Sequence, residues 1–241
     1  MLKIVLLLLS MAAKNSVKTY VENAFYHVYN QGVEQRNIFL DQQDYSVFLS
    51  YLQTYVSPKD TTSLYSIISS LDVSSKEKDR ALKLLKLRNY HGALQLCCYA
   101  LLPNHFHLLL LQIKMGLNEF MNSLGTRYAM YFNRKYRRKG VLFQDVYKAV
   151  LVYSDEQLLH ISRYIHQNPT EWLNLPPNHW RNLPYPSSLP DYLGERRTIW
   201  VTSKYVLDYF SKTNPQLSYE SFVTGTTDNN LVNELTIDLE N

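Results

Sequence analysis

The chain has 241 residues, of which 46% are hydrophobic, and a formal net charge of +4. This length and apolar content predict one large folded domain with a sizeable core, and they exclude a chain that is disordered throughout. The charge is uneven, because the sequence after Lys212 holds five acids and no Lys or Arg. Without those five acids the body carries about +9. A basic body favours a polyanionic partner, and nucleic acid is the commonest one.

Residues 1–19 are expected to form an N-terminal extension. Its apolar run, Ile4 to Leu9, is shorter than a usual secretory segment and far too short to span a bilayer. Met11-Ala12-Ala13 leaves a weak signal peptide open, but we favour Met11 as the true start, since a polar, basic segment leads from it into the first strand. We therefore expect a cytoplasmic protein with no membrane partner.

The predicted elements begin with an aromatic, β-branched strand over residues 25–33. Asp41 then predicts the N-cap of a helix that ends near Tyr55. Residues 57–92 are predicted to be a helical insertion that contains two short helices. Pro103-Asn104 predicts a turn between strands at 94–102 and 105–112, which together form a hairpin. Cys97 and Cys98 lie side by side in this hairpin, so they are predicted to point to opposite faces as buried thiols rather than to form a disulfide.

The second half predicts a helix over residues 117–138 and a strand over 147–153. Ser154 and Gln157 form a capping-box pattern, which starts a helix that Asn168-Pro169 is expected to end. The order predicts an α+β fold of the ferredoxin-like or RRM-like split βαβ type, with a central antiparallel sheet and helices on one face. We assign residues 20–175 to this domain, 176–212 to a C-terminal helical appendage with one helix at 203–211, and 213–241 to an acidic, partly disordered tail.

Two histidines interrupt the apolar strand at 105–112. His105 and His107 are two residues apart, so both imidazoles leave the same face, roughly 6.5–7 Å apart along the chain. Burying two such polar groups without partners is costly, and a shared metal ion satisfies both. A His-x-His pair alone is also common in core and surface strands.

A second motif, Arg163 to Pro169, places Tyr164 and Asn168 four residues apart, as neighbours on one helix face. A carboxamide oxygen can be a metal ligand, and a nearby phenol suits attack on a phosphodiester. Taken singly, Tyr164 also reads as a core aromatic and Asn168 as a helix C-cap.

The ordered set of motifs resembles the REP-associated tyrosine transposases of the HUH (IS200-like) single-strand DNA transposase superfamily, over roughly residues 20–205. The matching segments are Tyr26-His27-Val28-Tyr29-Asn30-Gln31-Gly32-Val33, Asn37-Ile38-Phe39, Leu102-Pro103-Asn104-His105-Phe106-His107-Leu108-Leu109, Tyr131-Phe132-Asn133, Gly140-Val141-Leu142-Phe143-Gln144, Tyr164-Ile165-His166-Gln167-Asn168-Pro169 and Ser187-Ser188 with Tyr192-Leu193.

The resemblance implies that His105, His107 and Asn168 bind Mg²⁺ or Mn²⁺ and that Tyr164 attacks the DNA strand. The products would be a 5′-phosphotyrosine and a free 3′-OH. The implied partner is single-stranded or hairpin DNA from repetitive palindromic elements. Its phosphates would be held by a largely basic set of residues, namely Arg127, Arg134, Lys135, Arg137, Arg138, Lys139, Lys148, Arg163 and Asn30.

The chain departs from the family pattern at three places, each of which removes positive charge near the expected DNA path. Gln31 stands where Arg is common, Glu171-Trp172 follows Asn168-Pro169-Thr170 where a basic residue is usual, and Asp145-Val146-Tyr147 replaces an Arg-aromatic pair. The metal and tyrosine positions are intact, so we expect retained chemistry with weaker or altered DNA binding.

Two alternatives stay open from the sequence. One is a DNA hairpin-binding protein, derived from a transposase, whose catalysis is weak or lost. The other is a zinc hydrolase that uses His105, His107 and either His160 or His166, although no HExxH or Cys-rich ligand set is present. A monomer and a homodimer fit the sequence equally well.

Overall fold

The computed structural model describes residues 20–181 and 183–225, so the predicted N-terminal extension and the end of the acidic tail lie outside the described residues. Four antiparallel strands form one sheet in the order β2–β3–β1–β4. The strands are β1 (Ala24–Gln31), β2 (Leu94–Leu101), β3 (His105–Gln112) and β4 (Lys148–Val152). The predicted α+β class with a central antiparallel sheet is confirmed.

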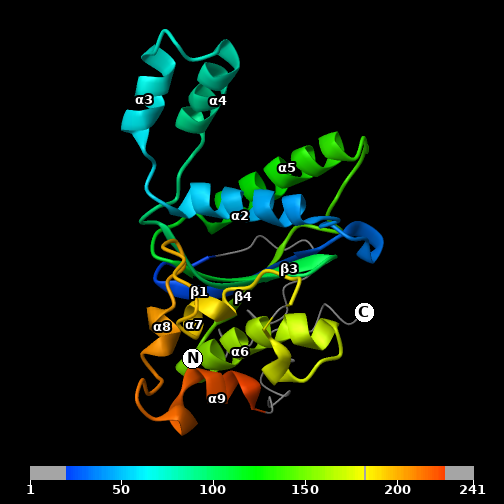
Figure 1. Ribbon diagram of the computed structural model, residues 1–241, viewed down its shortest axis with the longest axis vertical. Helices are drawn as coiled ribbons and strands as arrows, with labels where there is room; N and C mark the ends of the chain where they lie inside the picture. Colours follow the sequence, from blue (N-terminus) through cyan, green and yellow to red (C-terminus); the bar gives the residue numbers. More distant parts are fainter. Residues whose placement is uncertain (1–19, 182, 226–241) are drawn as a thin grey trace, which may run out of the picture.

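Helices lie on both faces of this sheet, not on one as the sequence predicted (Figure 1). On one face lie α2 (Gln42–Val56) and α5 (Leu117–Lys135), and on the other lies α6 (Asp155–Trp172). The cause is visible in β3, where Phe106 and Leu108 enter the first core while Leu109 and Leu111 enter the second. A strand that is apolar on both sides must be covered on both sides.

A bulge in β2 places both cysteines in the core beside α6. The register with β3 shifts between Leu96 and Cys98, so Cys97 is the extra residue. Both thiols are free and fully buried in that one core, and burial raises the pKa of Cys97 to about 12. The absence of a disulfide between them was predicted correctly, whereas the prediction of opposite faces was wrong because the bulge breaks the alternation.

The predicted insertion forms a helical hairpin, α3 (Thr61–Ser69) and α4 (Ser75–Lys86), which stands away from the rest of the molecule (Figure 1). Each helix begins at a side-chain cap. The carboxylate of Asp60 accepts from the Ser63 backbone N–H, and Ser74 forms a capping box with Glu77.

The helix α6 continues to Trp172, past Asn168-Pro169, where the sequence predicted its end. Pro169 lacks the N–H that would bond to Ile165, a loss that normally breaks a helix. Asn168, Pro169 and Thr170 are all buried, so packing against the sheet and the C-terminal segment holds this turn in place. Asn168 is therefore a residue within the helix rather than its C-cap.

The C-terminal segment packs on α6 and along the edge of β2. It contains η2 (Pro177–His179), α7 (Leu189–Tyr192), α8 (Lys204–Leu207), η3 (Pro215–Leu217) and α9 (Tyr219–Thr224). Backbone hydrogen bonds from Leu101 to Pro186, from Ser188 to Tyr99 and from Thr202 to Leu96 cover the β2 edge. The start of the predicted acidic tail contains α9, whose Tyr219 and Val223 are buried. Within the described residues, the helices are too short or too polar to cross a membrane.

Candidate active site

Strand β3 presents His105 and His107 on the face that packs against α6. The two rings lie 5.1 Å apart, centroid to centroid, and are nearly perpendicular. His107 is fully buried, whereas His105 is partly exposed. Phe106 between them enters the opposite core, as the alternation of a strand requires.

Two amide oxygens flank the ring of His105. Its Nδ1 lies 2.6 Å from Oδ1 of Asn104, and its Nε2 lies 3.1 Å from Oδ1 of Asn168. Burial lowers the pKa of His105 to about 4, against the contact with Asn168, so the ring is neutral and carries one N–H. In the tautomer with that proton on Nδ1, His105 donates to Asn104. The Nε2 lone pair then faces the Asn168 oxygen, an arrangement that requires a cation between the two atoms or a rotated amide.

His107 is held by a second histidine, His27 of β1. Nε2 of His27 lies 2.9 Å from Nδ1 of His107, and the two rings are stacked with their centroids 5.1 Å apart. Nε2 of His107 is buried and has no hydrogen-bond partner among the described residues. Burial, reinforced by the two neighbouring histidines, holds the pKa of His107 well below its usual value. An unpartnered, neutral imidazole nitrogen is a ready metal ligand.

The helix α6 brings Tyr164 to the same place. Its ring lies edge-on to His107 with the centroids 5.3 Å apart, and 6.0 Å from the ring of His27. Asn168 follows one turn later and reaches His105, so one helix face supplies both side chains, as their spacing predicted. Trp172, one further turn along, lies 5.6 Å from His105 and is partly exposed.

The donor set fits a divalent cation. Two neighbouring ligands of an octahedral Mg²⁺ lie about 3 Å apart at metal–ligand distances of about 2.1 Å, which matches the separation of His105 Nε2 from Asn168 Oδ1. The unpartnered Nε2 of His107 supplies a third donor atom. Over residues 20–181 and 183–225, no group of three His, Cys, Asp or Glu side chains is placed to hold a metal. The set is therefore complete only with the amide of Asn168.

Neither of the other histidines considered for a zinc site joins this cluster. His166 uses both ring nitrogens elsewhere, at 2.7 Å from the hydroxyl of Tyr219 and 2.8 Å from that of Ser188. Burial lowers the pKa of His166 to about 3, so the ring stays neutral. His160 packs on Phe222, with the ring centroids 5.9 Å apart. The zinc alternative therefore lacks its third histidine.

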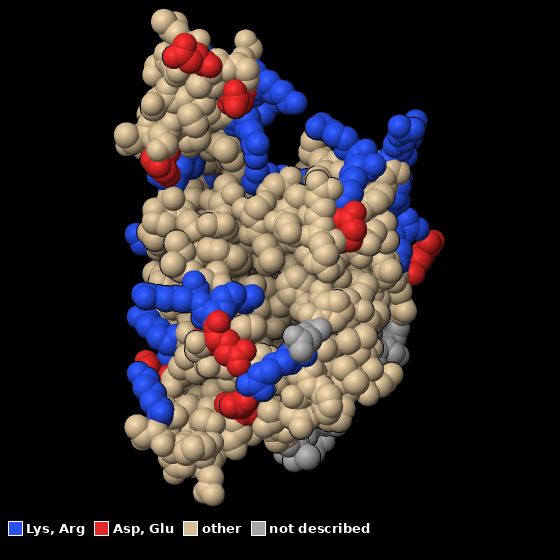
Figure 2. All heavy atoms as spheres, viewed as in Figure 1, with Lys and Arg blue, Asp and Glu red and all other residues tan. Residues whose placement is uncertain are grey.

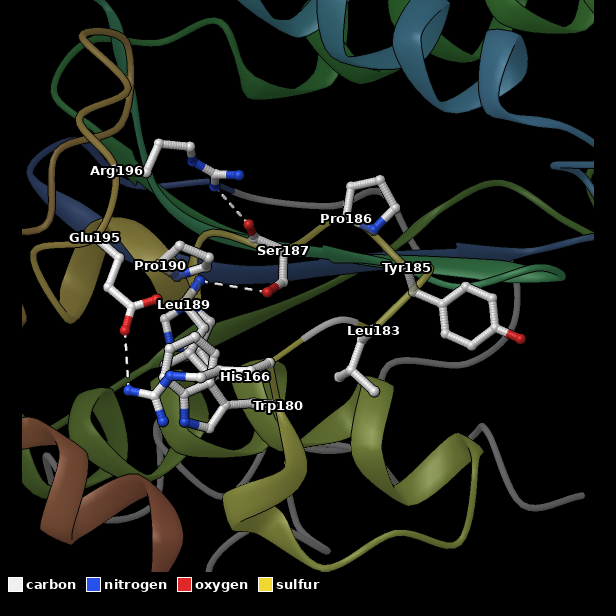
Figure 3. A pocket seen from close by; sticks show the side chains of 11 residues that line it. His166, Trp180, Leu183, Tyr185, Pro186, Ser187, Leu189, Pro190, Glu195 and Arg196 are labelled. Carbon is white, nitrogen blue, oxygen red and sulfur yellow. Dashed lines mark hydrogen bonds and ion pairs between the residues drawn. The ribbon is translucent and has the colours of Figure 1, made fainter.

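Figure 3 shows what His166 does instead. It lines a pocket of about 360 Å³ that also contains Trp180, Ser187 and Arg196, and that none of the four candidate site residues lines. Ser188 accepts a hydrogen bond from the backbone of Tyr99 as well as contacting His166. The late Ser187-Ser188 motif thus fastens the C-terminal segment to β2 and α6.

Three residues predicted to contact DNA form ion pairs or ring contacts with other residues of the protein. Lys135 pairs with Asp41 and with the fully buried Asp44, each at 2.7 Å. The guanidinium of Arg127 lies 3.8 Å from the centroid of the Tyr51 ring. That of Arg163 lies 3.6 Å from the Phe222 ring, and the residue is 8% exposed. These cations make contacts within the fold, and their assignment to the DNA surface stays a prediction.

The remaining predicted contacts divide by exposure. Arg134, Arg137 and Lys139 are exposed at the end of α5 and in the following loop. Arg138 is partly buried and donates to Asn133, and Lys148 is partly buried on β4. Asn30 donates to the backbone of Asp145 and lines a second pocket, between the sheet and α5, on the face opposite the histidines.

Backbone hydrogen bonds bring the basic loop after α5 to the end of the sheet that carries His105. Gln144 donates to Gln31, which pairs directly with His105, and Gly32 donates to Asn104. The loop that follows the exposed basic residues and the candidate metal donors therefore lie at one end of the sheet. His27 has no predicted role from the sequence. The detectable signal was a third histidine in an apolar strand, but only the β1–β3 register shows which residue it faces.

Comparison with known proteins shows a family similarity over the central part of the chain. Residues 73–168 match the family model described as "Transposase IS200 like". A solved structure described as "Structure of the REP associates tyrosine transposase bound to a REP hairpin" is similar at a TM-score of 0.49 and 11% identity, covering 86% of this chain and 97% of that chain. No curated protein sequence matches. The resemblance to IS200-like transposases is thus confirmed over a segment that carries His105, His107, Tyr164 and Asn168.

Proposed function

We propose that this protein is a metal-dependent tyrosine transposase that nicks and rejoins single-stranded or hairpin DNA. The observation that carries the proposal is the convergence of Tyr164 and Asn168, from one face of α6, on His105 and His107 of β3. The family match of residues 73–168 agrees with it.

The metal donors would be Nε2 of His105, Nε2 of His107 and Oδ1 of Asn168. Mg²⁺ or Mn²⁺ bound to them would polarise the oxygens of a scissile phosphodiester. His27 would accept a hydrogen bond from the Nδ1–H of His107, so that the Nε2 lone pair of His107 is left to bind the ion.

Tyr164 would act as the nucleophile. Its phenolic oxygen forms a bond to phosphorus while the bond from phosphorus to the 3′ oxygen breaks. The phenol proton passes to water, and the leaving 3′ oxygen takes up a proton. The products are a 5′-phosphotyrosine and a free 3′-OH. Attack by another 3′-OH reverses the step and joins strands, so no ATP is required.

DNA would approach the end of the sheet where the exposed basic residues lie. Arg134, Arg137 and Lys139 would neutralise phosphates. Trp172, 41% exposed beside His105, offers a flat surface on which an unpaired base can stack. Stacking there would offset part of the DNA affinity that is lost where this chain lacks the basic residues of the family pattern.

The Tyr164→Phe variant separates this proposal from the hairpin-binding alternative. A labelled single-stranded hairpin is incubated with wild type and variant in Mg²⁺ or Mn²⁺, and binding and cleavage are measured in parallel. We expect equal binding, with cleavage by wild type alone. Equal binding without cleavage by either protein would reject the transposase proposal and leave a DNA hairpin-binding protein.

A further inference from the structure

The α3–α4 hairpin makes few contacts with the domain that carries the candidate site. None of the residues of α3 is buried, and Ala81 is the one buried residue of α4. At its base the hairpin is tied firmly. Lys59 donates to the carbonyls of Leu85 and Leu87, and Asn89 donates to those of Thr54 and Ser57. It is therefore a projecting arm with an anchored base rather than a loose loop.

The positive charge of the arm is concentrated on α4 and the residues directly after it. The α3 helix contains no charged residue, whereas the segment from Ser75 to Arg88 contains six Lys or Arg and two acids, a net charge of +4. Lys76, Arg80, Lys83 and Lys86 are exposed and, by their helical spacing, lie on the face of α4 opposite the buried Ala81. One of them, Lys83, is paired along the helix with Asp79.

Figure 2 shows where this charge lies relative to the rest of the molecule. An open notch separates the arm from the end of α5, and Lys and Arg side chains border the notch from both sides. On the α5 side the exposed basic residues are Arg134, Arg137 and Lys139. The like charges on the two sides of the notch repel each other, whereas a polyanion bound between them would be attracted by both sides.

We propose that the arm is a second DNA-binding element, which contacts the backbone of a duplex lying in the notch between α4 and the end of α5. A 12-residue helix is about 18 Å long, which corresponds to about five base pairs of duplex. The contacts are to phosphates, so they hold and orient the DNA without reading its sequence. This inference rests on the proposed function for the presence of DNA, and it adds the arm, which stands away from the candidate active site, to the basic residues at the end of α5.

The test compares two triple variants of the full chain with equal loss of charge. The arm variant is Lys76→Gln, Arg80→Gln and Lys86→Gln. The control variant is Lys114→Gln, Lys204→Gln and Lys212→Gln, at exposed positions outside the arm and α5. Affinity is measured over a range of salt for an unpaired oligonucleotide and for hairpins with the same unpaired segment and stems of about 5 to about 15 base pairs.

For long stems, we expect the arm variant to bind at least about tenfold more weakly than wild type and with a shallower salt dependence, by up to about three counterions. Its affinity for the unpaired oligonucleotide should match that of the control. Equal affinity of arm variant, control and wild type for every stem would overturn the arm proposal while leaving the transposase proposal intact. Failure of wild type to bind any of these DNAs would reject both.

Discussion

In the proposed metal site, His107 would depend on His27 to present the correct nitrogen. Its Nε2 can bind a cation only when the ring proton lies on Nδ1, and His27 Nε2, at 2.9 Å, is the acceptor for that proton. Outer hydrogen bonds of this kind typically change metal affinity by about 10- to 100-fold. The geometry of the site thus extends into β1, beyond the two motifs that the sequence singles out.

We expect His27→Leu to weaken Mn²⁺ binding at least about tenfold, because the leucine cannot accept the Nδ1 proton of His107. Calorimetric titration with Mn²⁺ measures this without any DNA. His27→Gln keeps an acceptor oxygen and should restore most of the affinity. Full affinity in a folded His27→Leu protein would show that His27 does not position His107.

Lys135 is a cation that forms an ion pair within the fold. It is the ion-pair partner of Asp44, a carboxylate with no exposed surface, which also accepts from Tyr131 and Tyr136. Removing one member of a buried pair leaves the other charge without compensation, at a cost of about 3 kcal/mol or more.

The Lys135→Met variant is therefore expected to lower the free energy of unfolding by about 3 kcal/mol, as measured by urea denaturation. DNA affinity of the folded protein should change little. The exposed Lys139→Met is expected to do the reverse, with normal stability and weaker DNA binding. The opposite pattern would return Lys135 to the DNA surface.

At the scale of elements, α9 completes the burial of α6. Tyr219 bonds to Nδ1 of His166, and the side chain of Gln167 donates to the backbone of Val223. Phe222 covers the guanidinium of Arg163. The half of α6 that faces away from the sheet therefore depends on a helix about 50 residues later in the chain.

Ending the chain after Asn214 should destabilise the protein, because each polar group left buried without its partner costs about 1–3 kcal/mol. Thermal unfolding should show a loss of several degrees or more. Glu220→Gln changes an exposed side chain of the same helix and should leave the midpoint nearly unchanged. An unaltered midpoint after truncation would mean that α9 contributes nothing to the fold.

Local patterns predicted the elements well where neighbouring residues decide the structure. The turn at Pro103-Asn104 and the apolar runs on either side placed the hairpin of β2 and β3 to within about one residue. Helix propensity failed at Pro169, where packing against distant parts of the chain overrides it. The same division holds in the site: periodicity aligned Tyr164 with Asn168, whereas the pairing of His27 with His107 depends on strand register.

The contact partner of a charged side chain is the feature that residue type predicts least. Arg127, Arg163 and Lys135 lie in basic stretches or beside a motif, yet each is held by a ring or a carboxylate from another element. Sequence gives the sign of a side chain but not its partner. Only the three-dimensional structure distinguishes the exposed cations at the end of α5 and on α4 from these three residues.

At the scale of the whole molecule, the domain and the arm are nearly independent. Replacing residues 61–87 with a short Gly-Ser linker removes little buried surface, since Ala81 is the one buried residue among them. We expect the melting temperature of the remaining protein to stay within a few degrees of wild type, as a loss of about 1 kcal/mol would produce. A collapse of the melting transition would show that the arm belongs to the core.

The most direct test of the account is to look for covalent attachment of DNA to Tyr164. The full chain is incubated with a single-stranded hairpin and Mn²⁺, denatured, digested and examined by mass spectrometry. The account predicts a phosphonucleotide on the peptide that contains Tyr164, lost on metal chelation and absent from Tyr164→Phe, His107→Ala and Asn168→Ala. An adduct on another residue, or strand cleavage that survives in Tyr164→Phe, would contradict it.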